Sequence, residues 1–243
     1  MATPGMLVKV IAEAFREPVP TVTQHDRNLA VAGLRTMAGQ GKLAAHVTPL
    51  DAARLIVAVN GSRFVKDSVD TVRRYSETVP LRGGIRPYQN VNIPGLADLP
   101  DNHSLIDALT VIVAAAANGV LLPNLNQPYV FNSMLLTMDM PNTNASIRIH
   151  GPYSKGKNTS ADVKYHRSYT GKPMPPDDAG RDTYKRWHEA EEAARTSKGI
   201  DLPDGHGRRI LSEIHGEVFL LLGNLLRETG KNDATDKVGG TSG

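Results

Sequence analysis

The sequence predicts an α+β protein, and three observations lead to that prediction. Apolar residues recur at helical spacing in much of the first 80 residues. The apolar segment 104–119 has the signals of a buried helix at both ends. Residues 127–149 then change to the alternating pattern of strands around a turn. A β-hairpin beside a buried helix makes the second half of the chain α+β.

Composition places the chain among soluble globular proteins. Its 243 residues suffice for one large or two small domains. The absence of cysteine excludes disulfides and thiolate metal sites and favours a reducing cytoplasm. We expect neither a signal peptide nor a membrane span, because the most apolar stretch, 105–122, contains Asp107 and is short. The net charge of +3 permits an anionic partner.

The N-terminal residues predict two short helices separated by a turn. Leu7, Ile11 and Phe15 share one face of the first helix, and Pro18 ends the pattern. The second helix spans 21–32 and turns Val22 and Leu29 inward, together with His25 or Asp26. Gly33 suits the left-handed residue that ends a helix.

A hairpin and two further helices are expected next. Residues 34–47 carry Gly39-Gln40-Gly41 in the middle, as a hairpin tip would. Thr48, Pro49 and Asp51 then open a helix that runs to about residue 59. A second amphipathic pattern predicts a helix over 63–79, and this pair either serves dimerisation or completes the small core.

This order of elements resembles a winged helix-turn-helix, the domain of multiple-antibiotic-resistance-type bacterial regulators and of many phage proteins. The resemblance covers only the N-terminal part of the chain and rests on a loose pattern. The residues that carry it are Ile11-Ala12, Thr21-Val22-Thr23, Arg27-Asn28-Leu29, Ala32-Gly33-Leu34 and Val47-Thr48. In such domains the second helix enters the DNA major groove, and the hairpin wing lies along a neighbouring groove or the backbone.

The resemblance implies double-stranded DNA as the partner, and the polar face of the second helix has suitable chemistry. Arginine can pair with guanine, asparagine and glutamine with adenine, and threonine with base or phosphate. The expected DNA-binding residues are Thr21, Thr23, Gln24, Arg27, Asn28, Arg35, Gln40 and Lys42. The alternative is an ordinary helical hairpin with a solvated face. Residues 1–80 hold 10 Lys and Arg against 7 Asp and Glu, a difference of +3.

The remainder predicts a linker followed by a second domain. Residues 81–102 are rich in Gly and Pro and lack periodicity, so we interpret them as a linker. Residues 103–229 form the α+β domain, with the buried helix, the hairpin of 127–149 and a polar insertion near 151–207. Two more helices are expected, a charged one over 181–197 and a long amphipathic one over 208–228. Residues 230–243 are expected to be a disordered tail.

A basic stretch with interleaved tyrosines lies in the polar insertion, at 151–172. Such a stretch can track a nucleic-acid backbone and stack on exposed bases, although a solvated hairpin and loop is the alternative. The possible secondary contacts are Lys155, Lys157, Lys164, Tyr165 and Arg167.

No catalytic, metal or cofactor motif is present, and we expect a protein that is not an enzyme. The eight histidines are scattered, without metal-ligand spacing or a Gly-rich phosphate loop. His206 and Arg209 have a spacing found in tyrosine recombinases, but no tyrosine follows position 184 to act as nucleophile. We therefore expect a cytoplasmic bacterial or phage transcriptional regulator that binds a palindromic site as a dimer. The alternatives are a phage packaging or replication accessory protein and an enzyme with a DNA-targeting module.

Overall fold

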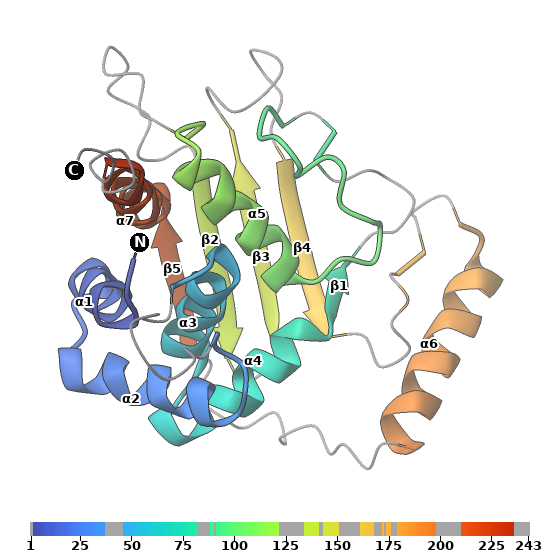
Figure 1. The fold of residues 1–243 in the computed structure, drawn as a ribbon. Helices are drawn as coiled ribbons and strands as arrows, with labels where there is room; N and C mark the ends of the chain where they lie inside the picture. The colour runs from blue at the N-terminus through green and yellow to red at the C-terminus, as the bar shows by residue number, and fades with distance from the viewer. Residues whose placement is uncertain are drawn as a thin grey trace, which may run out of the picture.

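The protein is described by a computed structural model. It describes residues 2–36, 46–81, 88–89, 91–121, 134–140, 143–150, 161–167, 172, 174–175, 179–197 and 210–235. Helices lie across one face of a five-stranded antiparallel sheet (Figure 1). The α+β class is therefore confirmed. Within the described residues, none of the helices combines the length and apolarity that crossing a membrane requires.

The two N-terminal helices form where the sequence predicts them. Helix α1 spans Pro4–Phe15 and α2 spans Val19–Val31, joined through Arg16 in a left-handed conformation. Both His25 and Asp26 turn inward beside Val22 and Leu29, and all are buried. Gly33, with φ of 69°, ends α2, and the Leu34 amide donates to the Leu29 carbonyl at 2.8 Å.

The next segment agrees with the sequence only in part. Helix α3, Pro49–Gly61, begins with a capping box between Thr48 and Asp51. The expected single helix over 63–79 is wrong. A short 3-10 turn η1 at Val65–Asp67, helix α4 at Ser68–Ser76 and strand β1 at Thr78–Pro80 replace it. Val79 precedes a proline and so disfavours helical backbone, and proline is tolerated in an edge strand.

One core unites the two parts that the sequence divides. The described residues between the proposed domains bury Tyr88, Val91, Ile93 and Leu96, so this segment belongs to the core and the linker interpretation is wrong for it. The buried apolar residues of α1 to α4 and those of the sheet form one continuous cluster. The helical N-terminal part therefore packs on the sheet-bearing part and shares its core.

Helix α5, Leu105–Ala117, is the central element of the helical layer and confirms the predicted buried helix. Ser104 and Asp107 form its capping box, and Gly119 follows its end at φ of 80°. Its small residues allow the close approach of helix α7, Gly216–Thr235. A Cβ atom added to Gly223 would lie 2.5 Å from the Ala116 carbonyl carbon, so only glycine fits there.

The sheet has the strand order β1-β4-β3-β2-β5. Its other strands are β2, Met134–Met140; β3, Asn144–Ile149; β4, Ala161–Arg167; and β5, Ile210–His215. The predicted hairpin is confirmed as β2 and β3, with Leu136 opposite Ile147. Strand β4, in the predicted polar insertion, pairs with both β3 and β1.

The C-terminal prediction needs two corrections. Helix α6, Arg181–Ser197, matches its predicted bounds and lies apart from the other helices (Figure 1). The helix predicted over 208–228 instead begins at Gly216, because residues 210–215 pair with β2 as strand β5. Helix α7 also continues through residue 230, where the disordered tail was expected to begin, and ends at Thr235. Residues 236–243 lie outside the described part.

Candidate nucleic-acid interface

Helix α2 exposes part of the expected DNA-reading face. Gln24 and Arg27 are exposed, whereas Thr21 and Thr23 are half-buried. The Thr23 hydroxyl donates to the Val19 carbonyl at 2.8 Å. The Gln24 amide donates to Asn28 Oδ1 at 2.9 Å, which limits the rotamers that Gln24 adopts. Gln24 and Arg27 therefore remain the side chains of this face that are open to a partner.

Asn28 and His25 hold the turn that precedes α4. Asn28 Nδ2 donates to the Val65 carbonyl at 2.9 Å, so its amide is engaged within the protein and not free for a base. His25 Nδ1 lies 2.7 Å from Ser68 Oγ, and the Ser68 hydroxyl in turn donates to the Val65 carbonyl. His25 is thus the donor to Ser68. Burial lowers the pKa of His25, which favours this neutral ring.

Arg35 is also engaged inside the protein. Its Nε lies 3.0 Å from Asp26 Oδ1, and both side chains are largely covered. Burial raises the pKa of Asp26, the nearby Asp51 carboxylate adds to that effect, and the Arg35 charge opposes it. The expected contact between Arg35 and DNA is therefore not supported, because Arg35 neutralises a buried carboxylate.

Asp51 holds both ends of the segment 37–45. Its carboxylate accepts hydrogen bonds from the Thr36 amide, the Thr48 amide and the Thr48 hydroxyl, each at 2.8 Å. Arg54 reinforces one end by donating to the Leu34 carbonyl at 2.9 Å. Thr36 and Thr48, on the two sides of this segment, are thus held close together near the C-terminal end of α2. Gln40 and Lys42, and the expected hairpin itself, lie in this segment and outside the described residues.

A cationic and aromatic cluster lies next to α2 on the turn that Asn28 and His25 hold. We call Arg63, Phe64 and Lys66 the turn cluster. Phe64 is 54% exposed. Arg63 Cζ lies 5.3 Å and Lys66 Nζ 5.6 Å from the centre of its ring. The helical period of 63–79 hides this cluster by favouring one helix there, although an aromatic residue between two cations is a visible signal in the sequence.

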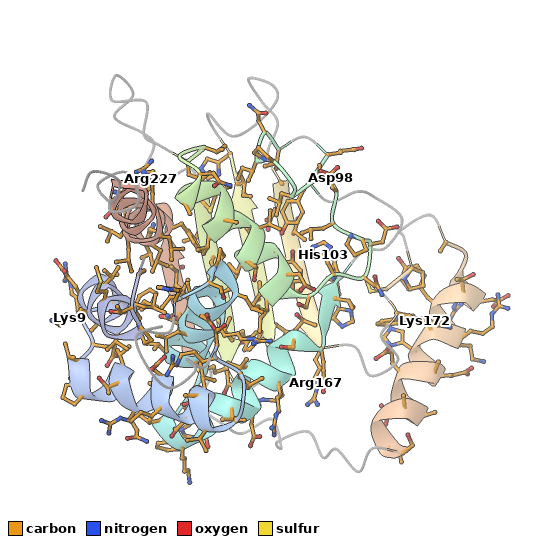
Figure 2. All side chains as sticks on the ribbon, viewed as in Figure 1. Lys9, Asp98, His103, Arg167, Lys172 and Arg227 are labelled. Carbon is orange, nitrogen blue, oxygen red and sulfur yellow. The ribbon has the colours of Figure 1, made fainter. Side chains whose placement is uncertain are left out.

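The expected secondary contacts on β4 are mostly engaged elsewhere. Tyr165 is 1% exposed, so it cannot stack on a base. Its hydroxyl lies 2.5 Å from that of Tyr88 and 2.8 Å from His103 Nε2. His103 Nδ1 donates to the Pro100 carbonyl at 2.6 Å, which leaves Nε2 to accept from Tyr165. His103 belongs to the segment before α5, and its side chain reaches Tyr165 on β4 (Figure 2).

Arg167 and Lys164 differ in their availability. Arg167 donates to Glu77 Oε2 from Nε at 3.0 Å and from Nη2 at 2.8 Å, at the lower end of β4 in Figure 2. Lys164 is exposed. Lys155 and Lys157 lie outside the described residues. Of the expected contacts in 151–172 that lie among the described residues, Lys164 is therefore the one available cation.

A polar hollow of about 430 Å³ lies on the outer face of the sheet. Its lining includes Thr137, Asp139, Ser146, Lys164 and His166. Burial lowers the pKa of His166. The centre of its ring lies 5.7 Å from the centre of the Trp187 ring on α6. The Ser146 hydroxyl is hydrogen-bonded to Thr137 at 2.6 Å. Among the described residues neither hydroxyl is hydrogen-bonded to His166, so the hollow does not form a hydroxyl–histidine pair.

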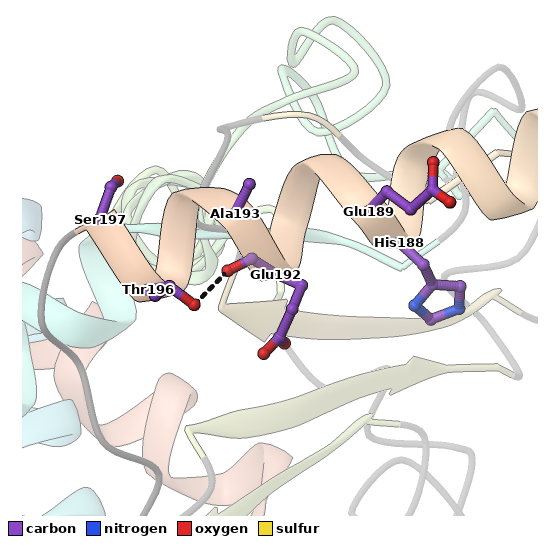
Figure 3. Close-up of a pocket in the computed structure, with 6 residues that line it drawn as sticks. All are labelled: His188, Glu189, Glu192, Ala193, Thr196 and Ser197. Carbon is purple, nitrogen blue, oxygen red and sulfur yellow. Dashed lines mark hydrogen bonds between the residues drawn. The ribbon is translucent and has the colours of Figure 1, made fainter.

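A second hollow lies along the surface of helix α6. Its lining residues, His188, Glu189, Glu192, Ala193, Thr196 and Ser197, all come from this one helix (Figure 3). A surface with a single wall does not enclose a ligand. No cluster of His, Asp or Glu among the described residues could hold a metal ion.

Comparisons of the chain with protein-family models, with curated proteins and with solved structures found no match. The interpretation of the α2 surface therefore depends on its own geometry and chemistry.

Proposed function

We propose that the protein binds double-stranded DNA in a sequence-specific manner, as a bacterial or phage transcriptional regulator. In this proposal residues 1–80 form a winged helix-turn-helix domain, with α2 in the major groove. The observation that supports it most directly is the exposure of Gln24 and Arg27 on α2, beside a segment whose two ends meet at Asp51.

Each group on this surface has a distinct role in the proposal. Arg27 has no ion pair among the described residues, so its two-pronged donor set is available to a guanine edge. Gln24 is oriented by Asn28 and presents an amide suited to adenine. Asn28 is a positioning residue because it holds the turn before α4. Arg35 is a positioning residue because it holds the end of α2. Gln40 and Lys42 are proposed wing contacts to the DNA backbone.

The proposed complex is a dimer on a palindromic site, because a two-fold protein presents two α2 helices to successive major grooves. The same surface would also serve a phage packaging or replication protein. DNase footprinting on selected sites, combined with sedimentation of the complex, distinguishes a dimer on paired half-sites from a larger ring.

The test is selection of a preferred duplex with the full-length protein, followed by titration of variants. Arg27→Ala should weaken binding to the preferred duplex by about 1–3 kcal/mol and relax specificity at one position. Lys42→Ala should weaken binding equally on preferred and scrambled DNA and lower the salt slope by roughly one unit. Lys9→Ala is the matched control, because Lys9 is an exposed cation on α1 (Figure 2). Absence of duplex binding by the wild-type protein at low salt would refute the proposal.

A further inference from the structure

The turn cluster is an unusual surface feature, because a large aromatic side chain is exposed between two cations. Phe64 exposes 54% of its surface, although burying it would be favourable. Both cations lie within 6 Å of the ring centre, a distance at which cation–π attraction holds them near it. Neither cation forms an ion pair with a described residue.

The turn that carries Phe64 is held in place by α2. The Val65 carbonyl accepts from Asn28 and from Ser68, and Ser68 accepts from His25. The Asp67 amide donates back to the Phe64 carbonyl at 2.9 Å. The backbone on the C-terminal side of Phe64 is therefore tied to the helix whose outer face carries Gln24 and Arg27. A partner that covers the exposed face of α2 and extends over this adjoining turn would contact the turn cluster as well.

We propose that Phe64 is an apolar wedge that contacts a base step of the bound DNA, next to the groove that α2 occupies. Arg63 and Lys66 would bind the phosphates on either side of that step. This inference rests on the proposed DNA-binding function and adds a second contact to it. Apolar side chains that enter a base step partly unstack it and bend the duplex.

Charge favours DNA over a protein as the partner of the turn cluster. The core of a protein interface is depleted in lysine, and desolvating a cation such as Lys66 is costly unless it is paired. Phosphates would pair with both cations while the ring contacts the sugars and bases between them. Asp67 and Asp70 follow on the same turn and helix, and Arg73 and Arg74 lie in the last turn of α4, so residues 63–76 hold four cations against two carboxylates.

The experiment uses the full-length protein, the preferred duplex and three readouts: affinity, the salt slope and the bend angle from energy transfer between end labels. Phe64→Ala should weaken binding about tenfold and reduce the bend, while the salt slope stays unchanged. Phe64→Leu should retain most of the bend, because leucine also serves as a wedge. Arg63→Ala and Lys66→Ala should each lower the salt slope by roughly one unit. Val120→Ala, at an exposed apolar residue just after α5, is the control.

The possible results separate this inference from the proposed function. If Arg27→Ala weakens binding but Phe64→Ala leaves affinity and bend unchanged, the wedge is wrong and the DNA-binding function stands. If the wild-type protein binds no duplex, the proposed function is itself refuted. If Phe64→Ala lowers the mass in sedimentation without affecting DNA affinity, Phe64 belongs to a subunit interface, and the wedge is overturned. Circular dichroism of each variant checks that the fold is retained.

Discussion

Helix α2 and strand β4 both carry polar and basic side chains, but they present them in different ways. Helix α2 is covered on one side by α1 and α3 and leaves Gln24 and Arg27 on its open side. Strand β4 lies inside the sheet, between β1 and β3. It buries Tyr165 on one face and exposes Lys164 on the other. In each element, the neighbours that cover it decide which polar groups remain available.

The difference shows how buried polar groups are accommodated in the two regions. Near α2, the buried carboxylate of Asp51 holds the backbone on both sides of the segment 37–45, and that of Asp26 pairs with the Arg35 side chain. Near β4, Tyr88, Tyr165 and His103 form a chain of neutral hydrogen bonds that ends at a backbone carbonyl. The first arrangement depends on charge and therefore on single cations such as Arg35. The second depends on packing and on complete hydrogen bonding.

The largest effect is expected at Tyr165. Tyr165→Ala should lower the free energy of unfolding by about 3–5 kcal/mol, because it removes a fully buried ring. Tyr165→Phe should cost about 1–3 kcal/mol, because Tyr88 and His103 each lose a buried partner. Urea unfolding measures both values. The matched control is Lys164→Ala on the opposite face of β4, which should change stability by less than about 0.5 kcal/mol. Equal effects at positions 164 and 165 would contradict the assignment of the two faces.

The second prediction compares the two arginines near α2. Arg35→Ala should lower the free energy of unfolding by about 1–3 kcal/mol at neutral pH, because it leaves the covered Asp26 carboxylate without its cation. Arg27→Ala should change it by less than about 0.5 kcal/mol, since Arg27 is exposed. The deficit of Arg35→Ala should shrink as the pH falls, because the raised pKa of Asp26 lets the carboxyl group become neutral. Addition of Asp26→Asn should recover part of the loss, and a deficit independent of pH would contradict the charge explanation.

Much of the fold follows from local signals in the sequence. The box of Ser104 and Asp107 identifies α5 because the capping groups lie within four residues of each other. Strand β5 escapes detection because Ile210 and Ile214 are four residues apart, a spacing that fits a helical face and also alternate positions of a strand. Its strand conformation depends on pairing with β2, which is remote in the chain. The core position of Tyr88 likewise depends on a distant strand.

The candidate site, like the fold, has parts that local sequence signals predict and parts that they do not. The helical period places Gln24 and Arg27 on the outer face of α2 without any knowledge of the fold. It also places Asn28 there, but the Val65 carbonyl that engages Asn28 comes from a turn 37 residues later. The partner of Arg35 is closer, yet Asp26 becomes its partner only because the chain reverses at Gly33. Side chains whose partners come from another element cannot be assigned by periodicity.

The smallest expected effect is a loss of stability in mild acid. Its measurement tests whether the α2 and β4 regions both require a neutral histidine. Burial lowers the pKa of His25 and of His103 from the ordinary value of 6.5. The unfolded chain therefore binds more protons than the folded chain as the pH falls below about 6.5, and stability decreases in that range. His25→Asn keeps a donor to Ser68 without a titrating ring, so it should flatten part of this dependence in urea unfolding between pH 7.5 and pH 5.5 (about one unit either side of the ordinary pKa). The wild-type protein gives the reference slope, and the charge of Asp26 is common to both proteins. A variant slope equal to that of the wild type would show that His25 does not contribute, which would leave His103 and the β4 region as the origin of the acid sensitivity.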